Sequence, residues 1–229
     1  MATGETAGEF EVPGASCVTG PSPSAKATRI DKLRAESPAA LAELVGGLGD
    51  GPLDIALSPE DELVPLLKDL GFTPYSETAT VARRIDGFRK DPAPQGVRIE
   101  PYRNEWAESF TRAEAAAMED FSLFKEVGSP TGFETAEGWG TFLAARRGEE
   151  IVGFVQAEMP TGWINWIGVV PSERRKGIGR TLVGEIAIAV RDAVGSHLCA
   201  EIDDTPEAGA FWKELGFTHR TRLVSLIRR

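Results

Sequence analysis

Apolar residues recur at helix and strand spacing along most of this chain. In the first half, Leu41, Leu44, Val45 and Leu48 follow the i, i+3, i+4, i+7 spacing of an amphipathic helix. The preceding pair Ser37-Pro38 supplies an N-cap and a proline for the first helical turn. This helix is expected to end at the glycines within 46–51, and a strand Leu53–Leu57 should follow it. A second helix should start at Ser58-Pro59-Glu60-Asp61 and bury Leu63, Leu66, Leu67 and Leu70. The last element predicted in this half is a strand, Thr78–Ile85.

The second half of the chain predicts a longer alternation of strands and helices, in the order β-α-β-β-β-α-β-α-β. Between the first helix and the second strand, residues 121–138 predict a loop or a short additional helix. The expected strands are Val97–Tyr102, Thr141–Ala145, Ile151–Glu158, Ile164–Val170, Leu198–Ile202 and Thr221–Ile227, and the expected helices are Glu105–Asp120, one after the basic turn at 174–180 that ends near Gly195, and one capped by Thr205-Pro206-Glu207.

Composition shifts indicate the domain organisation. Residues 1–30 are rich in Gly, Pro, Ser, Ala and Thr, which predicts a flexible or extended segment, with a weak hairpin near Glu9–Val12 and Ser16–Thr19 as the alternative. Two prolines and two glycines within 86–96 indicate a linker. We therefore expect a segment 1–30, a small unit 31–86, a linker 87–96 and a larger domain 97–229.

Charge and cysteine content exclude several classes of function. The formal net charge of −10 argues against a nucleic-acid-binding protein, which usually carries a basic surface. Cys17 and Cys199 form neither a disulfide framework nor a zinc spacing, so no metal site is expected. There is no signal-peptide pattern and no apolar run of membrane-spanning length. We expect a cytoplasmic protein, with no membrane partner and with a monomer and a homodimer both left open.

A short apolar strand, a basic glycine-containing turn and a helix follow one another from Trp166 to Leu182. The first backbone N–H groups of a helix have no intrahelical partner, and the helix dipole favours negative charge beside them. Gly177 and Gly179 lack Cβ atoms, so an anion can approach the backbone closely. With the neighbouring cations, this turn predicts a phosphate-binding site.

These residues resemble the acyl-CoA-binding motif of the GNAT superfamily of N-acetyltransferases, Arg/Gln-x-x-Gly-x-Gly/Ala after a strand that ends in Val-x-Pro. Val169, Pro171, Arg174, Gly177 and Gly179 match it position by position. A later stretch, Ala208-x-x-Phe211-Trp212-x-x-x-Gly216-Phe217, is similar to the family's second motif, and the resemblance covers residues 97–229. It implies an α/β (α+β) fold, in which helices flank a mixed, mostly antiparallel central sheet.

The resemblance also implies a reaction. A protein of this family transfers acetyl from acetyl-CoA to a primary amine of a small molecule or peptide, by direct attack of the amine on the thioester. Two alternatives stay open: a non-catalytic protein that binds or senses acetyl-CoA, and a structural relative that binds no coenzyme A.

The family's cofactor site carries over to the strand, the turn and the helix start. The pyrophosphate would lie on backbone N–H groups near the helix start with the cations around it, and the pantetheine arm would pair with the strand. The oxyanion would meet a backbone N–H near Val169. The expected cofactor-binding residues are Ile167, Val169, Arg174, Arg175, Lys176, Gly177, Ile178, Gly179, Arg180 and Thr181.

The catalytic acid and base are where the sequence departs from the family. Trp212 occupies the position of the usual tyrosine acid, and its indole N–H has no proton to give at neutral pH. Trp163 occupies the position of a common glutamate base. Glu201 and Asp203 are the preferred replacement bases, while Glu158, His197, His219 and a chain of waters stay open. The expected acceptor cleft comprises residues 121–139 and 160–163, whose aromatic side chains form either a pocket or part of the core.

The first half of the chain contains a partial repeat of the second. At an offset of 145 residues, Leu70-Gly71-Phe72-Thr73 falls on Leu215-Gly216-Phe217-Thr218, and the order of helix, strand, capped helix and strand also agrees. We interpret residues 31–86 as a truncated GNAT-like C-terminal half; coincidence is the alternative. Because it has no counterpart of Arg174–Gly179, this unit is not expected to bind coenzyme A.

Overall fold

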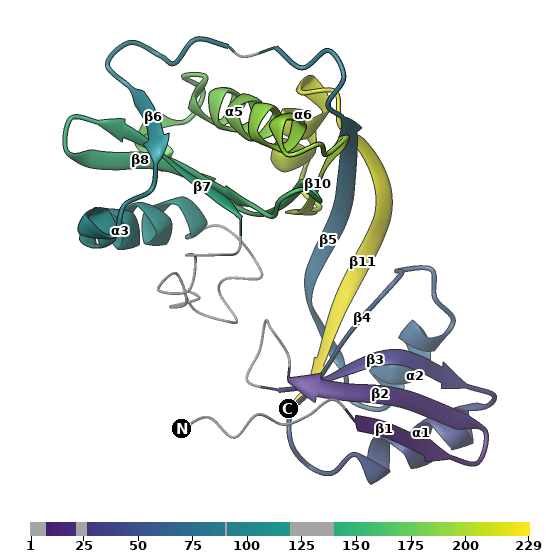
Figure 1. Ribbon diagram of the computed structural model, residues 1–229. Coiled ribbons are helices and arrows are strands. Elements are labelled where there is room, and N and C mark those ends of the chain that lie inside the picture. The colour runs from purple at the N-terminus through teal and green to yellow at the C-terminus, as the bar shows by residue number, and fades with distance from the viewer. Residues whose placement is uncertain (1–7, 22–26, 90, 120–139) are drawn as a thin grey trace. The chain divides into compact units, whose positions relative to one another are not determined.

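The computed structural model describes residues 8–21, 27–89, 91–119 and 140–229 (Figure 1). Contacts divide the chain into two compact units: unit 1 comprises residues 1–78 and 221–229, and unit 2 comprises residues 79–220. Strands β5 (Thr73–Arg84) and β11 (Thr218–Arg228) therefore contribute residues to both units. The division within these strands replaces the boundary that we expected at 87–96, because proline and glycine content marks a loop but cannot show where tertiary contacts change.

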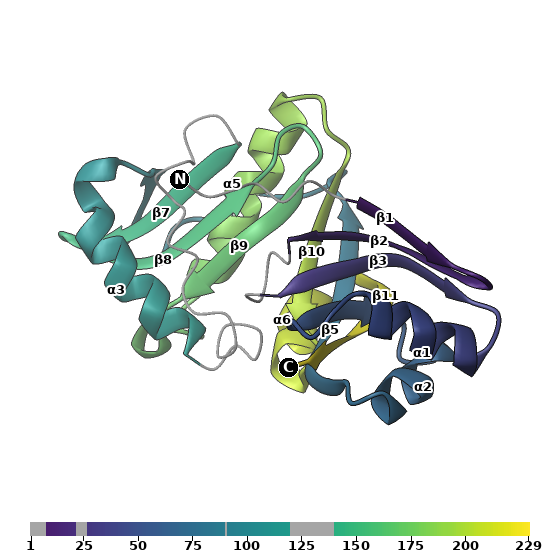
Figure 2. The same cartoon turned by 90° about the horizontal axis from the view of Figure 1, so that it is seen from below.

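Unit 2 is built on a sheet with the strand order β5-β10-β9-β8-β7-β6. Neighbouring strands from β6 to β9 are antiparallel, whereas β9 and β10 are parallel, so the sheet is mixed and mostly antiparallel as expected. Helices α3 and α5 lie on opposite faces of this sheet (Figure 2). The elements are β6 (Arg98–Pro101), η1 (Asn104–Trp106), α3 (Ala107–Met118), β7 (Thr141–Arg147), β8 (Glu150–Ala157), β9 (Trp163–Val169), η3 (Pro171–Glu173), α5 (Ile178–Asp192), β10 (His197–Asp203) and α6 (Pro206–Glu214).

Helices α5 and α3 each bury an apolar face, against opposite sides of the sheet. The apolar face of α5 includes Leu182, Val183 and Ile186, all fully buried in the core that also contains the inward-facing residues of β8 and β10. On the opposite face, Phe110 of α3 contacts Phe142 and Phe154 edge to face, with ring centroids 5.3 and 5.1 Å apart. The sheet is thus covered on both sides, which fixes the strands that carry the candidate site.

Strands β9 and β10 separate after a short paired segment. Their registered pairs are Trp163 with Cys199 and Ile164 with Ala200, and the Cys199 N–H donates to the Gly162 carbonyl at 2.9 Å. Beyond these pairs β9 continues to Val169 and β10 to Asp203 with no further registered pair in the described chain. We call the opening between residues 165–169 and 201–203 the fork.

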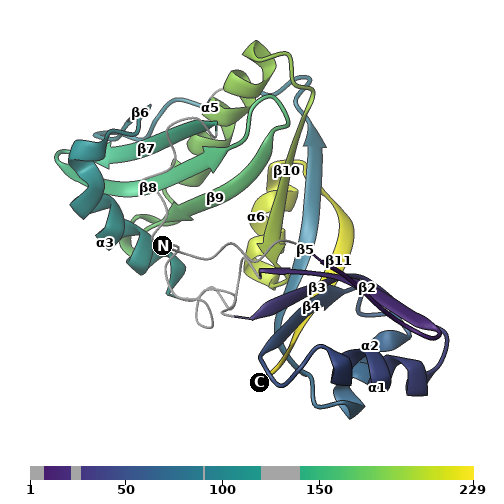
Figure 3. The same ribbon diagram turned by 60° about the horizontal axis from the view of Figure 1, so that its bottom comes forward.

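Unit 1 has the strand order β1-β2-β3-β4-β11-β5, and α1 and α2 lie on one face of its sheet (Figure 3). For residues 8–21 the hairpin alternative is correct, since β1 and β2 pair antiparallel. Strand β3 was not expected, and α2 begins at Leu63 instead of Ser58 because the Asp61 carboxylate accepts the Leu63 N–H at 2.9 Å. The elements are β1 (Gly8–Val12), β2 (Ala15–Pro21), β3 (Thr28–Ala35), α1 (Pro38–Gly47), β4 (Leu53–Leu57) and α2 (Leu63–Asp69).

The two units share more architecture than the partial repeat predicted. In unit 1, β3 and β4 are parallel and pair Arg29 with Asp54; in unit 2, β9 and β10 are parallel and pair Trp163 with Cys199, which is Asp54 plus the offset of 145. In each unit two antiparallel strands precede the parallel pair, so β1-β2-β3 corresponds in order to β7-β8-β9. The correspondence therefore begins before residue 31, where we had placed its start.

Candidate cofactor-binding site

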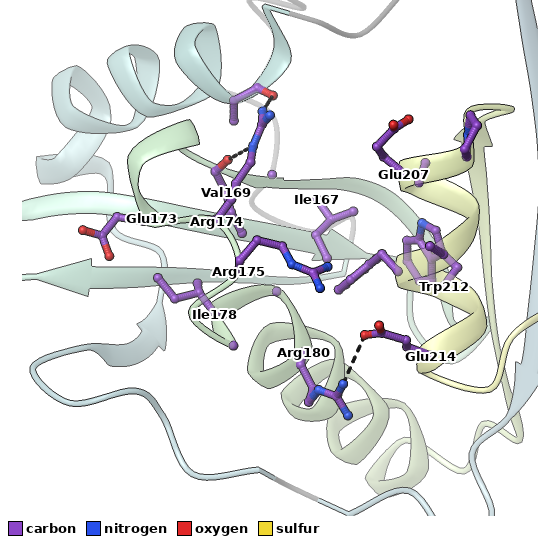
Figure 4. Close-up of a pocket in the computed structure, with 18 residues that line it drawn as sticks. Ile167, Val169, Glu173, Arg174, Arg175, Ile178, Arg180, Glu207, Trp212 and Glu214 are labelled. Carbon is purple, nitrogen blue, oxygen red and sulfur yellow. Dashed lines mark hydrogen bonds and ion pairs between the residues drawn. The ribbon is translucent and has the colours of Figure 1, made fainter.

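A cavity of about 1020 Å³ lies within unit 2, between the end of β9, the start of α5 and helix α6 (Figure 4). Its lining combines glycines and cations on one side with apolar residues of α6 on the other. The lining residues are Ala117, Ile167, Gly168, Val169, Glu173, Arg174, Arg175, Gly177, Ile178, Gly179, Arg180, Pro206, Glu207, Ala208, Ala210, Phe211, Trp212 and Glu214.

The start of α5 presents backbone donors to this cavity. Gly177 is the N-cap and has a left-handed φ of 90°, which glycine adopts without a steric cost. The Thr181 N–H donates to the Gly177 carbonyl, so the preceding N–H groups of residues 178–180 have no intrahelical partner. A Cβ at Gly179 would lie 3.2 Å from the Phe211 ring, so the missing side chain keeps the helix start close to α6. An anion fits this helix start.

The edge of β9 presents a second row of polar groups. Gly153 pairs with Val169, and the Val170 N–H donates to the Val152 carbonyl at 3.0 Å. This pattern makes Gly153–Val169 a non-hydrogen-bonded pair, so the Val169 N–H and C=O face away from β8. Two residues earlier, the same groups of Ile167 face the same way. The β9 edge therefore offers backbone hydrogen bonds into the fork.

The cations around the helix start differ in their contacts. Arg180 reaches Glu214 at 3.5 Å and Asp91 at 3.8 Å, and Lys176 reaches Glu173 at 3.2 Å. Glu173 also accepts from Arg147 at 3.0 Å. Hydrogen bonds from Arg147 and then from Lys176 hold the pKa of the Glu173 carboxyl below its ordinary value. These pairs leave part of the positive charge of the turn already balanced by carboxylates.

The two consecutive arginines point in different directions. The Arg174 guanidinium donates to the Val169 carbonyl at 3.1 Å and to the Ala117 carbonyl of α3 at 3.0 Å. Arg175 has a left-handed φ of 62°, and Figure 4 shows its guanidinium directed across the cavity towards α6. Within the described part of the chain, no hydrogen bond or ion pair of the Arg175 side chain occurs.

The structure brings together the expected cofactor-binding residues except two. Thr181 is buried, and its hydroxyl donates to the Gly177 carbonyl of its own helix at 3.2 Å. Lys176 is paired with Glu173 and is not among the lining residues. Three further lining residues, Ala117, Glu207 and Glu214, were not expected at the site from the sequence. Glu207 and Glu214 belong to α6, the helix that the second family motif at 208–217 indicated.

The expected catalytic residues separate into two groups. Val169 and Trp212 line the cavity, and Trp212 is 4% exposed, with ring centroids 5.3 Å from Phe211 and 4.7 Å from Phe217. Glu201 and Asp203 are not among the described lining residues. They alternate along β10 with core residues that pack towards α5, so their side chains leave the opposite face of the sheet, the face that carries α3.

The other candidates lie away from the cavity. Glu158 accepts from Asn165 at 3.2 Å and from Thr161 at 3.4 Å in the turn between β8 and β9. Tyr102, the tyrosine of unit 2, was not a candidate and also lies outside this cavity: it stacks on Phe142 with centroids 4.4 Å apart, and burial raises the pKa of its hydroxyl. Of the expected acceptor cleft, residues 121–139 lie outside the described part of the chain.

Known proteins resemble this chain in sequence and in fold. The model of the acetyltransferase (GNAT) family matches residues 99–217. Mycothiol acetyltransferase of Catenulispora acidiphila is 31% identical over 176 residues, which cover 66% of this chain and 53% of that protein. This chain thus spans about half the length of that curated relative.

Solved structures share the fold at low sequence identity. A GCN5-related N-acetyltransferase from Sphaerobacter thermophilus superposes with a TM-score of 0.69 at 15% identity, covering 94% of this chain and 76% of that one. A GCN5-related N-acetyltransferase from Kribbella flavida gives 0.63 at 17% identity, with coverages of 97% and 90%. The expected fold class is therefore confirmed. No helix in the described residues has the length and apolar character needed to cross a membrane.

Proposed function

Because the chain belongs to the acetyltransferase (GNAT) family, we propose that it transfers acetyl from acetyl-CoA to a primary amine of a small molecule or peptide. The observation that carries this proposal is a single cavity bordered by the open N–H groups of α5 and by the polar edge of β9. The open N–H groups of α5 suit phosphates, and the polar edge of β9 suits an extended arm that contains amides. Coenzyme A contains both phosphates and such an arm.

The residues present fit coenzyme A. Its pyrophosphate would be held by the backbone N–H groups of residues 178–180, where the helix dipole favours negative charge. Its pantetheine amides would pair with the β9 edge at Ile167, as an added strand does, because the Val169 carbonyl already accepts from Arg174. When bound, the cofactor supplies an activated acyl group as a thioester.

Within this proposal, a backbone N–H of β9 stabilises negative charge that develops on the carbonyl oxygen. The Val169 N–H faces the fork, and the Ile167 N–H, further from the helix start, faces the same way. A donor held by the sheet needs no rearrangement as charge develops, which is the physical basis of such stabilisation. We keep Val169 as the proposed donor, with Ile167 as the neighbouring alternative.

Glu201 is the better placed of the two proposed bases. The last registered pair of β10 with β9 is at Ala200, so Glu201 is the first residue of this strand beyond that pair, and its side chain is exposed. Asp203 is 8% exposed, which limits its access to a diffusing acceptor. We therefore propose Glu201 as the group that removes the ammonium proton, directly or through water.

Trp212 favours a second candidate function, the binding of acetyl-CoA without transfer. Its buried indole provides an aromatic wall for the cavity but no exchangeable acidic proton. The leaving thiol has a pKa of about 8.5, so water suffices to protonate the thiolate, and Trp212 weakens catalysis without preventing it.

Titration calorimetry with acetyl-CoA tests the site, and release of free thiol across a panel of amines tests the reaction. The panel includes the acceptor of mycothiol acetyltransferase. We expect binding together with amine-dependent thiol release, and Glu201→Gln should reduce the release far more than Asp203→Asn. Tight binding without release on any amine would favour the second candidate, and absence of binding would contradict both.

A variant at Trp212 separates the two candidates further. If protonation of the thiolate limits turnover, Trp212→Tyr should raise the rate of thiol release with little change in acetyl-CoA affinity. Trp212→Phe is the matched control, because it keeps an aromatic ring without an acidic group. Equal rates in both variants would remove this proton transfer from the mechanism.

A further inference from the structure

Arg174 and Arg175 are adjacent cations at the edge of one cavity, yet only one of them has its donors already engaged in the described structure. The Arg174 guanidinium spans two backbone carbonyls, those of Val169 and Ala117. Arg175 makes no such contact there, and its side chain crosses the cavity (Figure 4). Sequence alone assigned the same cofactor-binding role to both.

Among the described residues, neither carbonyl that Arg174 binds has a partner in its own element. Helix α3 ends at Met118, so the Ala117 carbonyl belongs to its last turn, where carbonyls lack intrahelical donors. A cation at a helix C-terminus is also favoured by the helix dipole. The Val169 carbonyl faces the fork because residue 169 forms a non-hydrogen-bonded pair with Gly153. One planar guanidinium thus joins the end of α3 to the end of β9.

The packing beneath this contact shows that the separation of α3 and β9 is tightly defined. A Cβ placed on Gly168 would lie 2.9 Å from the Ala117 Cβ, closer than real side chains approach. The end of α3 therefore rests directly on the backbone of β9, beside the residues that face the fork. Arg174 holds the same two segments together from the cavity side.

Arg175 has the complementary properties. It has a left-handed φ of 62° and lies two residues before the N-cap Gly177 of α5. A guanidinium presents paired donors that match phosphate oxygens. Lys176 and Arg180 are already close to carboxylates, so within the described structure Arg175 is the cation of this turn whose donors are open to a ligand.

We propose that Arg174 is a positioning residue that fixes the end of α3 against β9, whereas Arg175 supplies the side-chain contact to the pyrophosphate of coenzyme A. The inference rests on the proposed function for its ligand, but the role of Arg174 concerns the protein alone. It assigns different roles to two adjacent arginines, of which only Arg174 stands at a specified position of the family motif.

Four variants in the full chain test this division: Arg174→Gln, Arg174→Lys, Arg175→Gln and Arg175→Lys. Lysine restores the charge at either position but cannot span two carbonyls with one planar group. We expect Arg175→Gln to weaken the binding of coenzyme A by about 10-fold to 100-fold, and Arg175→Lys, which keeps the charge but loses the paired donors, to weaken it less.

The Arg174 variants should behave in the opposite way. Both should bind coenzyme A within about threefold of wild type, since backbone donors and Arg175 remain. Both should show faster hydrogen exchange at the amides of residues 115–118, measured without ligand, and lysine should not rescue this exchange. The Arg175 variants serve as the matched control and should exchange there as wild type does.

Dephospho-coenzyme A locates the phosphate that Arg175 contacts, because it lacks the 3′-phosphate but keeps the pyrophosphate. Arg175→Gln should weaken the binding of both ligands equally. A loss confined to coenzyme A, an equal loss of affinity in Arg174→Gln, or unchanged exchange in both Arg174 variants would overturn the proposal. Failure of the wild-type protein to bind coenzyme A would contradict the proposed function instead, and the exchange measurement would still decide the role of Arg174.

Discussion

From β1 in unit 1 and from β7 in unit 2, strands and helices follow one another in the same order, but the units differ where a strand leads into its helix. In unit 2, β9 ends at Val169 and α5 begins at Ile178, so residues 170–177 form the connection. In unit 1, β3 ends at Ala35 and α1 begins at Pro38, so only Glu36 and Ser37 connect them.

In unit 1, the short connection itself supplies a hydrogen-bond acceptor for the start of helix α1. The Ser37 hydroxyl accepts the Ala40 N–H at 3.2 Å, which uses one of the open donors at the start of α1. In unit 2 the N-cap is Gly177, which has no side chain to offer, and the donors of α5 remain for a ligand. One fold thus either closes a helix start with its own cap or leaves it open as an anion site.

This difference predicts one cofactor site per chain, in unit 2. The predictions below test whether the two units divide stability and binding in this way. Deletion of all residues before the expected linker 87–96 is unsuitable, because it would also remove residues 79–84 of β5, which belong to unit 2.

The largest effect is expected from matched core substitutions. Leu44 of α1 and Leu182 of α5 are both fully buried, so each change to alanine should lower the free energy of unfolding by about 2–5 kcal/mol. Leu182→Ala should also weaken the binding of coenzyme A, since it loosens the helix whose start forms the site. Chemical denaturation and calorimetry measure both quantities, and a similar loss of binding in Leu44→Ala would contradict the division.

A polar network in unit 1 should affect stability alone. The Tyr75 hydroxyl donates to the fully buried Asp54 carboxylate at 2.9 Å, and Arg29 lies 3.7 Å from the same carboxylate. Tyr75→Phe should lower the free energy of unfolding by about 1–3 kcal/mol, because a buried carboxylate loses a donor. Titration with coenzyme A should be unchanged, and a shift in its affinity would show that unit 1 supports the site.

The same hydroxyl makes this contribution pH-dependent. Burial, together with the charge of Asp54, raises the pKa of Tyr75 above its ordinary value. The stabilisation is therefore fully present below about pH 10 and is lost as pH rises through the folded-state value. Wild type and Tyr75→Phe should accordingly converge in stability at strongly alkaline pH.

Two left-handed glycines provide a smaller, matched pair. Gly177 has φ 90° and Gly71 has φ 87°, and neither would clash with a neighbour through an added Cβ. Each change to alanine should cost about 1–2 kcal/mol of stability, because a side chain disfavours this conformation. Only Gly177→Ala should also weaken coenzyme A binding, and equal affinities in the two variants would show that the cap geometry is not used by the ligand.

The smallest expected effect is on stability at acid pH, and it concerns Glu173, which directly precedes the basic turn. The pKa of Glu173 is lowered by Arg147 and Lys176, so its stabilising pairs are present above the ordinary glutamate value of about 4.3 and are lost as pH falls through the folded-state value. Glu173→Gln should remove this acid dependence. Thermal unfolding between about pH 6 and pH 3 measures it, with Glu207→Gln as the control, since Glu207 forms no ion pair with any described residue; identical acid profiles for wild type and Glu173→Gln would contradict it.

Much of unit 2 was predictable because its signals are local. The strand, turn and helix from Trp166 to Leu182 and the cap at Thr205 depend on residues close in sequence, and both appear as expected. Strand β3 gave no such signal, since charged residues interrupt its apolar positions and Lys32 adopts a left-handed φ of 52°. Its place is fixed by pairing with β2 and β4.

The sequence by itself determined which chemistry this chain contains: the basic glycine turn, the family it belongs to, and the tryptophan in place of a tyrosine acid. Only the tertiary structure decided which groups are available. It used the Thr181 hydroxyl within its own helix, directed Arg174 to two carbonyls and left Arg175 facing the cavity. The physical reason is that a motif specifies residue types and spacing, whereas partners for hydrogen bonds and ion pairs come from segments as distant in sequence as Ala117 and Glu214.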